Sequence, residues 1–246
     1  MFDFSRTGYD IGTIFGVPIR LDISLIILAA FYIIRAGLIN GLLITVALVA
    51  AILVHELGHA IAMKAFNCKV RDITIMFFGG AATTYNMPKA PWKDAVISLA
   101  GPVAGLVLWA IIPFIVQLIP IKIVALLLAQ IAFISGWLSL FNLIPAYPLD
   151  GGHVLRAILT IFKGRIEGTR ISCKVAYGIA ALMGIYGLLH LDAFMIIIAF
   201  FIWSSARSEL ATLSHFQTYD DDDDDVIISP PPYGGDRDYT KLNRKR

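Results

Sequence analysis

Residues 42–66, LLITVALVAAILVHELGHAIAMKAF, place a metal-binding motif directly after a run of apolar residues. The nineteen residues 36–54 contain no charged side chain, and His55, Glu56 and His59 follow them. A helix of about 20 apolar residues is long enough to cross a bilayer. Because a water-exposed metal site does not need such a flank, the stretch predicts ionisable chemistry inside a membrane.

The composition of the whole chain agrees with a membrane location. Of its 246 residues, 58% are hydrophobic and 15% are charged, whereas soluble domains have about 25% charged residues. The mean hydropathy is +0.76. A chain this apolar cannot bury its surface in one water-soluble core, so it is predicted to be an integral membrane protein. The net charge of +2 offers no argument for nucleic acid as a partner.

The apolar stretches predict an all-α polytopic membrane protein with about six transmembrane helices. The expected helices cover residues 21–39, 40–64, 95–119, 122–144, 173–190 and 192–206. We expect a membrane-embedded domain at residues 1–206, with its core at about residues 40–160. Residues 207–246 include six consecutive Asp residues and are predicted to form a disordered cytoplasmic tail.

The distribution of basic residues predicts the orientation. All but two of the 20 Lys and Arg residues fall on the side that both termini share, and the exceptions are Arg35 and Lys122. The positive-inside rule then predicts that both termini are cytoplasmic. The expected location is the cell membrane of a prokaryote. His55 precedes Lys64, the first basic residue after the motif, by nine residues. It should therefore lie about 14 Å below the cytoplasmic surface.

Residues 68–86, CKVRDITIMFFGGAATTYN, differ in composition from the helices on either side. They are rich in β-branched and aromatic residues around Gly79 and Gly80, which predicts a short membrane-associated β-hairpin. The apolar tip is expected to dip toward the metal-binding motif, where exposed backbone is tolerated only against protein or a water-filled cavity. An ordinary amphipathic surface hairpin is the alternative.

His55 and His59 are spaced to bind one metal ion. Histidines four residues apart lie on one face of a helix, so both imidazoles can reach a single Zn²⁺, with Glu56 beside them to act on a bound water. A catalytic zinc ion normally has three protein ligands and one water. The third ligand is Asp150 or His153 in FNLIPAYPLDGGHVLRAIL, where prolines break a helix and two glycines permit close backbone approach. Asp150 is the preferred candidate.

Four motifs, HELGHA, FFGGAA, SLAGPVAG and FNLIPAYPLDGGHVLRA, occur in this order between about residues 45 and 160. In order and spacing this chain resembles the site-2 protease family of intramembrane zinc metalloproteases. The resemblance implies a three-helix catalytic core. It also implies one Zn²⁺ per chain, bound by His55, His59 and Asp150, with Glu56 as the general base. The implied activity is hydrolysis of peptide bonds in or near transmembrane segments during regulated intramembrane proteolysis.

The resemblance also implies roles for residues outside the donor set. Asn142 matches an asparagine that helps to stabilise the tetrahedral intermediate. Phe78, Gly79 and Gly80 match a hairpin that pairs with the unwound substrate, and residues 101–102 match a Gly-Pro element that packs the third core helix. The implied partner is a single-span membrane protein in the lipid bilayer.

Two positions depart from the pattern of many relatives. Gly105 stands where many have Asn, and His153 stands where many have Arg. Because histidine can bind a metal ion, a contact between His153 and the metal is an open alternative. No sequence remains for a PDZ or CBS domain, so the resemblance is to the short form. The alternatives are a metal-ion transporter, which should carry polar residues along several helices, and a non-catalytic scaffold, which should have lost Glu56 or a metal ligand.

Overall fold

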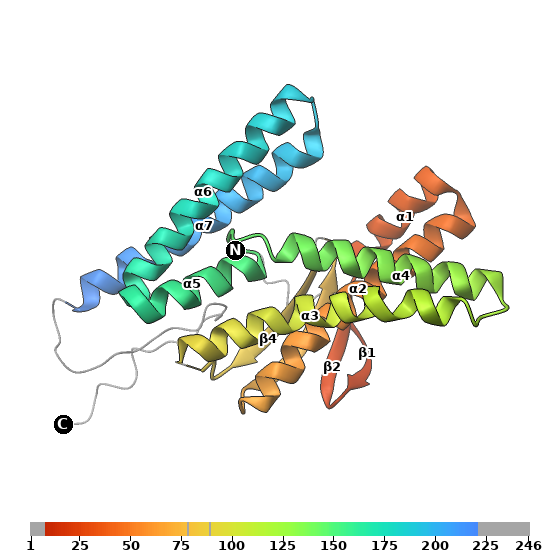
Figure 1. Ribbon diagram of the computed structural model, residues 1–246, viewed down its shortest axis with the longest axis horizontal. Helices are drawn as coiled ribbons and strands as arrows, with labels where there is room; N and C mark the ends of the chain where they lie inside the picture. The colour runs from red at the N-terminus through yellow and green to blue at the C-terminus, as the bar shows by residue number, and fades with distance from the viewer. Residues whose placement is uncertain (1–7, 78, 89, 221–246) are drawn as a thin grey trace.

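The computed structural model describes residues 8–77, 79–88 and 90–220, with side chains up to residue 213. Helices predominate, and four strands form a single sheet (Figure 1). The elements follow in the order β1 (Gly8–Ile14), β2 (Val17–Asp22), α1 (Ser24–Ala36), α2 (Leu38–Ala65), β3 (Lys69–Met76), β4 (Gly79–Tyr85), α3 (Pro91–Val116), α4 (Lys122–Asn142), α5 (Asp150–Lys163), α6 (Arg165–Leu189) and α7 (Ala193–Asp220).

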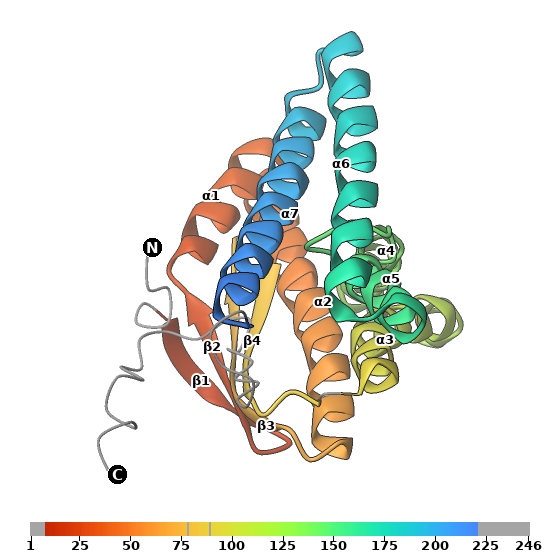
Figure 2. The ribbon, with the colours of Figure 1, turned by 90° about the vertical axis from the view of Figure 1, so that its left-hand side faces the viewer.

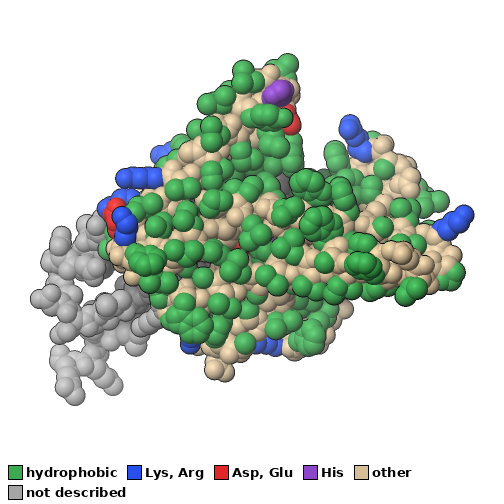
Figure 3. Space-filling view, in the orientation of Figure 1, with side chains coloured by type: hydrophobic (Ala, Val, Ile, Leu, Met, Phe, Trp, Pro, Cys, Tyr) green, Lys and Arg blue, Asp and Glu red, His purple; other side chains and the backbone are tan. Residues whose placement is uncertain are grey.

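Five helices in the described ranges, α2, α3, α4, α6 and α7, are long and apolar enough to cross a membrane. Hydrophobic side chains cover most of the face shown in Figure 3, and Lys and Arg gather at its margins. Such a surface is stable in lipid rather than in water. The chain is therefore an integral membrane protein, as predicted.

One of the six predicted transmembrane spans, residues 21–39, is not confirmed. The first expected helix corresponds to α1, which has 13 residues and would extend only about 20 Å. Part of its predicted range, 21–39, is used instead by the end of β2 and by the start of α2.

The sheet is larger than the single predicted hairpin. The strand order is β1-β2-β3-β4, in which β2 and β3 are parallel and the two outer pairs are antiparallel. Phe15 and Gly16 connect β1 to β2 with φ angles of 50° and 70°, the backbone of a two-residue hairpin turn. The predicted hairpin at residues 68–86 is β3 and β4, and the N-terminal strands were not predicted.

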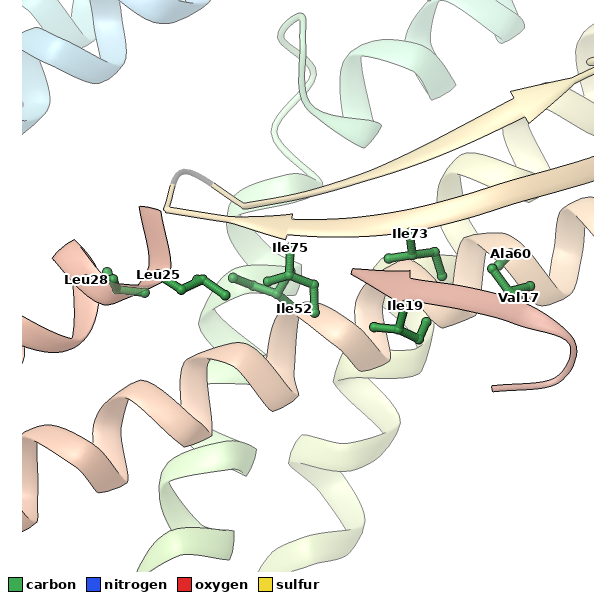
Figure 4. Packing of buried hydrophobic residues seen from close by; sticks show 8 residues of the cluster. All are labelled: Val17, Ile19, Leu25, Leu28, Ile52, Ala60, Ile73 and Ile75. Carbon is green, nitrogen blue, oxygen red and sulfur yellow. The ribbon is translucent and has the colours of Figure 1, made fainter. Parts of the chain in front are cut away.

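The core beneath the sheet joins the strands to the metal-binding helix. Val17 and Ile19 of β2 and Ile73 and Ile75 of β3 alternate along their strands and are 0–1% exposed. They pack with buried side chains of α1 and α2, as Figure 4 shows, and the full cluster is Val17, Ile19, Leu25, Leu28, Ile52, Ala60, Ile73 and Ile75. Burial of one large aliphatic side chain contributes about 1.5–3 kcal/mol, so this cluster holds the sheet firmly against α2.

The helices divide into a central group and a peripheral hairpin. Helix α2 packs against α1, α3, α4 and β3, whereas α6 packs against α5 and α7. Figures 1 and 2 show α6 and α7 as an antiparallel pair that extends away from α3 and α4. Helix α5, which packs against both α3 and α6, connects the two groups.

Two C-terminal features differ from the prediction. Helix α5 was not predicted, because its 14 residues are amphipathic rather than uniformly apolar. Helix α7 continues through the predicted domain boundary at residues 206 and 207 and ends at Asp220. The predicted tail from residue 221 onward lies outside the described residues.

Candidate metal centre

His55 and His59 lie one helical turn apart on α2, and both are buried. Their Nε2 atoms are 3.2 Å apart, and their rings meet edge to face with centroids 4.8 Å apart. The 3.6-residue period of the helix brings positions i and i+4 to the same face. The predicted pairing of these two imidazoles is therefore present in the structure.

Asp150 reaches the same point from the first residue of α5. Its Oδ2 lies 3.0 Å from His55 Nε2 and 3.3 Å from His59 Nε2. Gly151 and Gly152 let the first turn of α5 press against the preceding loop. A Cβ at Gly151 would lie 2.5 Å from the Ile144 carbonyl oxygen, and a Cβ at Gly152 would lie 2.6 Å from the Ala146 carbonyl carbon.

The three donors match the geometry of a zinc site. Tetrahedral ligands about 2.0–2.1 Å from a zinc ion lie about 3.3 Å from one another. The three donor separations here are 3.0, 3.2 and 3.3 Å. Two imidazole nitrogens and one carboxylate oxygen are also donors that Zn²⁺ accepts in catalytic sites. Among the described residues, His55, His59 and Asp150 form the one group of three or more such side chains placed to hold a metal ion.

His153, the other candidate for the third ligand, is not part of this group. Its ring lies 4.6 Å from the ring of Tyr147, and the Tyr147 hydroxyl can donate to Nδ1 at 3.4 Å. Burial and the neighbouring Arg156 guanidinium lower the pKa of His153. Its ring therefore contacts Tyr147 and does not contribute to the donor group.

Helix α3 orients His59 from behind. The Nδ1–H of His59 donates to the Ile97 carbonyl oxygen at 2.7 Å. Because that carbonyl can only accept, the bond selects the tautomer that leaves Nε2 free to bind a metal. Gly101 provides the space for the ring, since a Cβ there would lie 2.5 Å from Cε1 of His59. The sequence predicted only a packing role for Gly101, because a contact between helices cannot be read from spacing.

Glu56 is half-buried beside His55 and contacts the sheet. A Cβ at Gly80 of β4 would lie 2.7 Å from Glu56 Oε1, so the β4 backbone passes directly over this carboxylate. Gly79 has a φ of 138°, which a glycine adopts readily, and its vicinity is open. Phe78, also predicted to contact substrate, lies outside the described residues.

Asn142 is at the C-terminal end of α4. Its side-chain amide donates to the Leu138 carbonyl oxygen at 2.9 Å, one turn earlier on the same helix. A contact with substrate would require this amide to leave its hydrogen bond or to use its carbonyl oxygen. The structure therefore brings His55, Glu56, His59, Asp150 and Gly80 together, and it holds Asn142 on its own helix.

Comparisons with known proteins agree with this site. The family model described as Peptidase family M50 matches residues 43–123 and 117–186. The chain is 30% identical over 200 residues to zinc metalloprotease MJ0392 of Methanocaldococcus jannaschii, covering 80% of this chain and 58% of that protein. It is also 30% identical over 228 residues to the putative zinc metalloprotease sll0528 of Synechocystis, covering 83% of this chain and 60% of that protein.

A solved structure has the same fold. The chain matches the site-2 protease from Methanocaldococcus jannaschii with a TM-score of 0.65 and 26% identity, over 92% of this chain and 100% of that one. The chain spans about three-fifths of the length of the two curated relatives, at 58% and 60%.

Proposed function

Because this chain belongs to peptidase family M50, we propose that it is an intramembrane zinc metalloprotease. His55, His59 and Asp150 bind one Zn²⁺, and Glu56 is the general base. The observation that carries the proposal is the triangle of donors 3.0–3.3 Å apart, with a carboxylate one residue after His55.

The chemistry follows from this donor set. When bound, Zn²⁺ polarises a carbonyl and lowers the pKa of water to about 7, which supplies a nucleophile at neutral pH. Glu56 accepts the proton of that water and delivers it to the leaving amine. The Ile97 carbonyl keeps the proton of His59 on Nδ1, so Nε2 stays a donor to the metal throughout. Asn142 is the residue that the family resemblance assigns to the substrate carbonyl oxygen.

Strand β4 is a docking edge for substrate. It is the last strand of the sheet order β1-β2-β3-β4, so its backbone groups on the side away from β3 can pair with an added strand. Gly80 places this edge against Glu56. A transmembrane helix conceals its carbonyls in internal hydrogen bonds, and local unwinding followed by strand addition at Gly79 and Gly80 would present one peptide bond to the base.

The proposed substrate class is a single-span membrane protein, which is the partner that the family resemblance implies. The distribution of Lys and Arg supports cytoplasmic termini. The relatives from Methanocaldococcus jannaschii and Synechocystis support a prokaryotic cell membrane as the setting. The protease domain extends past the predicted boundary at residue 206, because α7 continues through it, and the Asp-rich stretch that follows is cytoplasmic.

Co-expression with a single-span substrate tests the proposal. We expect wild type to cleave it and Glu56→Gln to lower cleavage about 10²–10⁴-fold while zinc content stays equal, since the amide cannot accept the proton. Asn40→Gln, a change on α2 away from the motif, is the matched control. Cleavage by Glu56→Gln at the wild-type rate with zinc retained would refute the mechanism. Zinc flux into vesicles without any cleavage would instead support a transporter, and zinc binding with neither would support a scaffold.

A further inference from the structure

A part-buried ion cluster joins α5 to two other helices. Arg156 of α5 donates from one guanidinium nitrogen to Asp94 Oδ2 of α3 at 2.6 Å. Its other terminal nitrogen lies 3.4 Å from Glu209 Oε1 of α7. The side chains of Arg156, Asp94 and Glu209 are 15%, 19% and 28% exposed.

The contacts of the cluster hold the Arg156 guanidinium in one orientation. A charge removed from water is tolerated when it is paired and hydrogen-bonded, and a planar guanidinium holds its partners in fixed directions. Tyr147 covers one face of this guanidinium, with its ring centroid 5.7 Å from Cζ. Asp94 also lies in the first turn of α3, where a carboxylate is favoured by the helix dipole. Arg156 is therefore held in one orientation rather than loosely paired at a surface.

The position of the cluster connects it to the metal site. Arg156 follows Asp150 by six residues on the same helix, which is about 9 Å along its axis. On α3, Asp94 precedes Ile97 by three residues, so the two lie on one face. The Ile97 carbonyl accepts the hydrogen bond of His59. One turn of α3 thus contacts both the histidine ligand of α2 and the helix that carries Asp150.

We propose that Asp94 and Arg156 are positioning residues of the metal site. Their ion pair holds α5 on the turn of α3 that orients His59, and this sets the approach of Asp150 to the two histidines. The inference rests on the proposed role of Asp150 as a metal ligand. Glu209 has a smaller part, because its contact with Arg156 is longer and more exposed.

Metal affinity of the full-length protein in detergent micelles tests this inference. Asp94→Asn and Arg156→Gln should each weaken Zn²⁺ binding about 10–100-fold in chelator competition, the range for residues that orient ligands. The double variant should bind Zn²⁺ no more weakly than the single variant with the lower affinity, because both changes break the same ion pair. The visible spectrum of bound Co²⁺ should change in all three, since it reports ligand geometry. Glu209→Gln should weaken Zn²⁺ binding less than threefold.

Arg170→Gln is the matched control. Arg170 pairs with Glu167 at 2.7 Å, but both side chains are more than 40% exposed and the pair lies within α6. Zn²⁺ affinity and the Co²⁺ spectrum should equal those of wild type. If Arg156→Gln does not fold, Arg156→Lys is measured instead. Lysine keeps the positive charge but lacks the two terminal guanidinium nitrogens that contact Asp94 and Glu209. A Zn²⁺ affinity between those of wild type and Asp94→Asn supports the inference, and wild-type affinity overturns it.

Asp150→Asn separates failure of this inference from failure of the proposed function. If Asp150→Asn loses Zn²⁺ whereas Asp94→Asn and Arg156→Gln bind it like wild type, the positioning role is refuted and the ligand assignment stands. If Asp150→Asn binds Zn²⁺ like wild type, the ligand assignment fails, and the positioning role fails with it.

Discussion

The two halves of the donor set reach the same point by different means. His55 and His59 are neighbours on one helix, so the helical period alone places them on one face, where their Nε2 atoms are 3.2 Å apart. Asp150 lies 95 residues from His55 along the chain and arrives at the start of a different helix. The pairing of the histidines is therefore a property of local structure, whereas the approach of Asp150 depends on how α5 packs on α3.

Removal of a ligand from either half should have the largest effect. His59→Ala and Asp150→Ala should both lose stoichiometric Zn²⁺ and all detectable cleavage, a loss greater than the 10–100-fold typical of supporting residues. His153→Ala should keep its metal, because this imidazole faces Tyr147. Metal analysis of the purified variants measures this. Metal loss in His153→Ala with full retention in Asp150→Ala would exchange the two assignments.

Gly151→Ala should damage only the half that depends on packing. The added Cβ would overlap the backbone carbonyls of Leu143 and Ile144, and backbone cannot rotate away as a side chain can. We expect a destabilisation of about 1–3 kcal/mol and weaker Zn²⁺ binding, measured by thermal unfolding with and without zinc. Gly178→Ala is the control, since a Cβ there has no atom within 4 Å. Equal melting temperatures and zinc affinities for the two variants would contradict this account of α5.

Gly101→Ala should disturb the histidine half through tertiary contact. Its Cβ would displace the His59 ring and weaken the bond from Nδ1 to the Ile97 carbonyl. Zn²⁺ affinity should fall about 10–100-fold in chelator competition. The same Gly178→Ala variant serves as the control. An unchanged affinity would mean that α2 holds both histidines without help from α3.

Gly80→Ala should have the smallest effect and should leave both halves intact. Its Cβ would meet the Glu56 side chain, which can move to a less favourable rotamer at about 0.5–1.5 kcal/mol. Zn²⁺ content should therefore match wild type, while the cleavage rate falls up to about tenfold. A parallel measurement of zinc and of substrate cleavage distinguishes these outcomes. Loss of zinc in this variant would show that β4 supports the ligands as well as the base.

Much of the architecture could be read from the sequence. The family resemblance, the membrane location and five of the helices are confirmed, because apolar runs of membrane length are long-range signals that survive any packing. The first expected span, at residues 21–39, is not confirmed, since a short helix and parts of two neighbouring elements share that apolar stretch. Helix α5 was not predicted, because an amphipathic helix after two prolines lacks a continuous apolar run.

The N-terminal strands β1 and β2 were also not predicted. Strand β2 is stable because it pairs with β3 in parallel and buries Val17 and Ile19 against α2, and such partners are distant in sequence. Residues 68–86 were easier to predict, because β3 and β4 are adjacent and joined by a short turn. Local hairpins can be recognised from composition, whereas pairing between distant strands cannot.

The membrane setting and the pair of histidines with the glutamate beside them can be read from the amino-acid order, because they depend on composition and on the period of one helix. Three other features become visible only in the folded chain. Asp150 rather than His153 joins the two histidines, the Ile97 carbonyl and Gly101 hold His59, and Asp94 and Arg156 join α3 to α5. Each of these contacts joins different elements. Their distances are set by how helices pack, and packing depends on the side chains of every element at once.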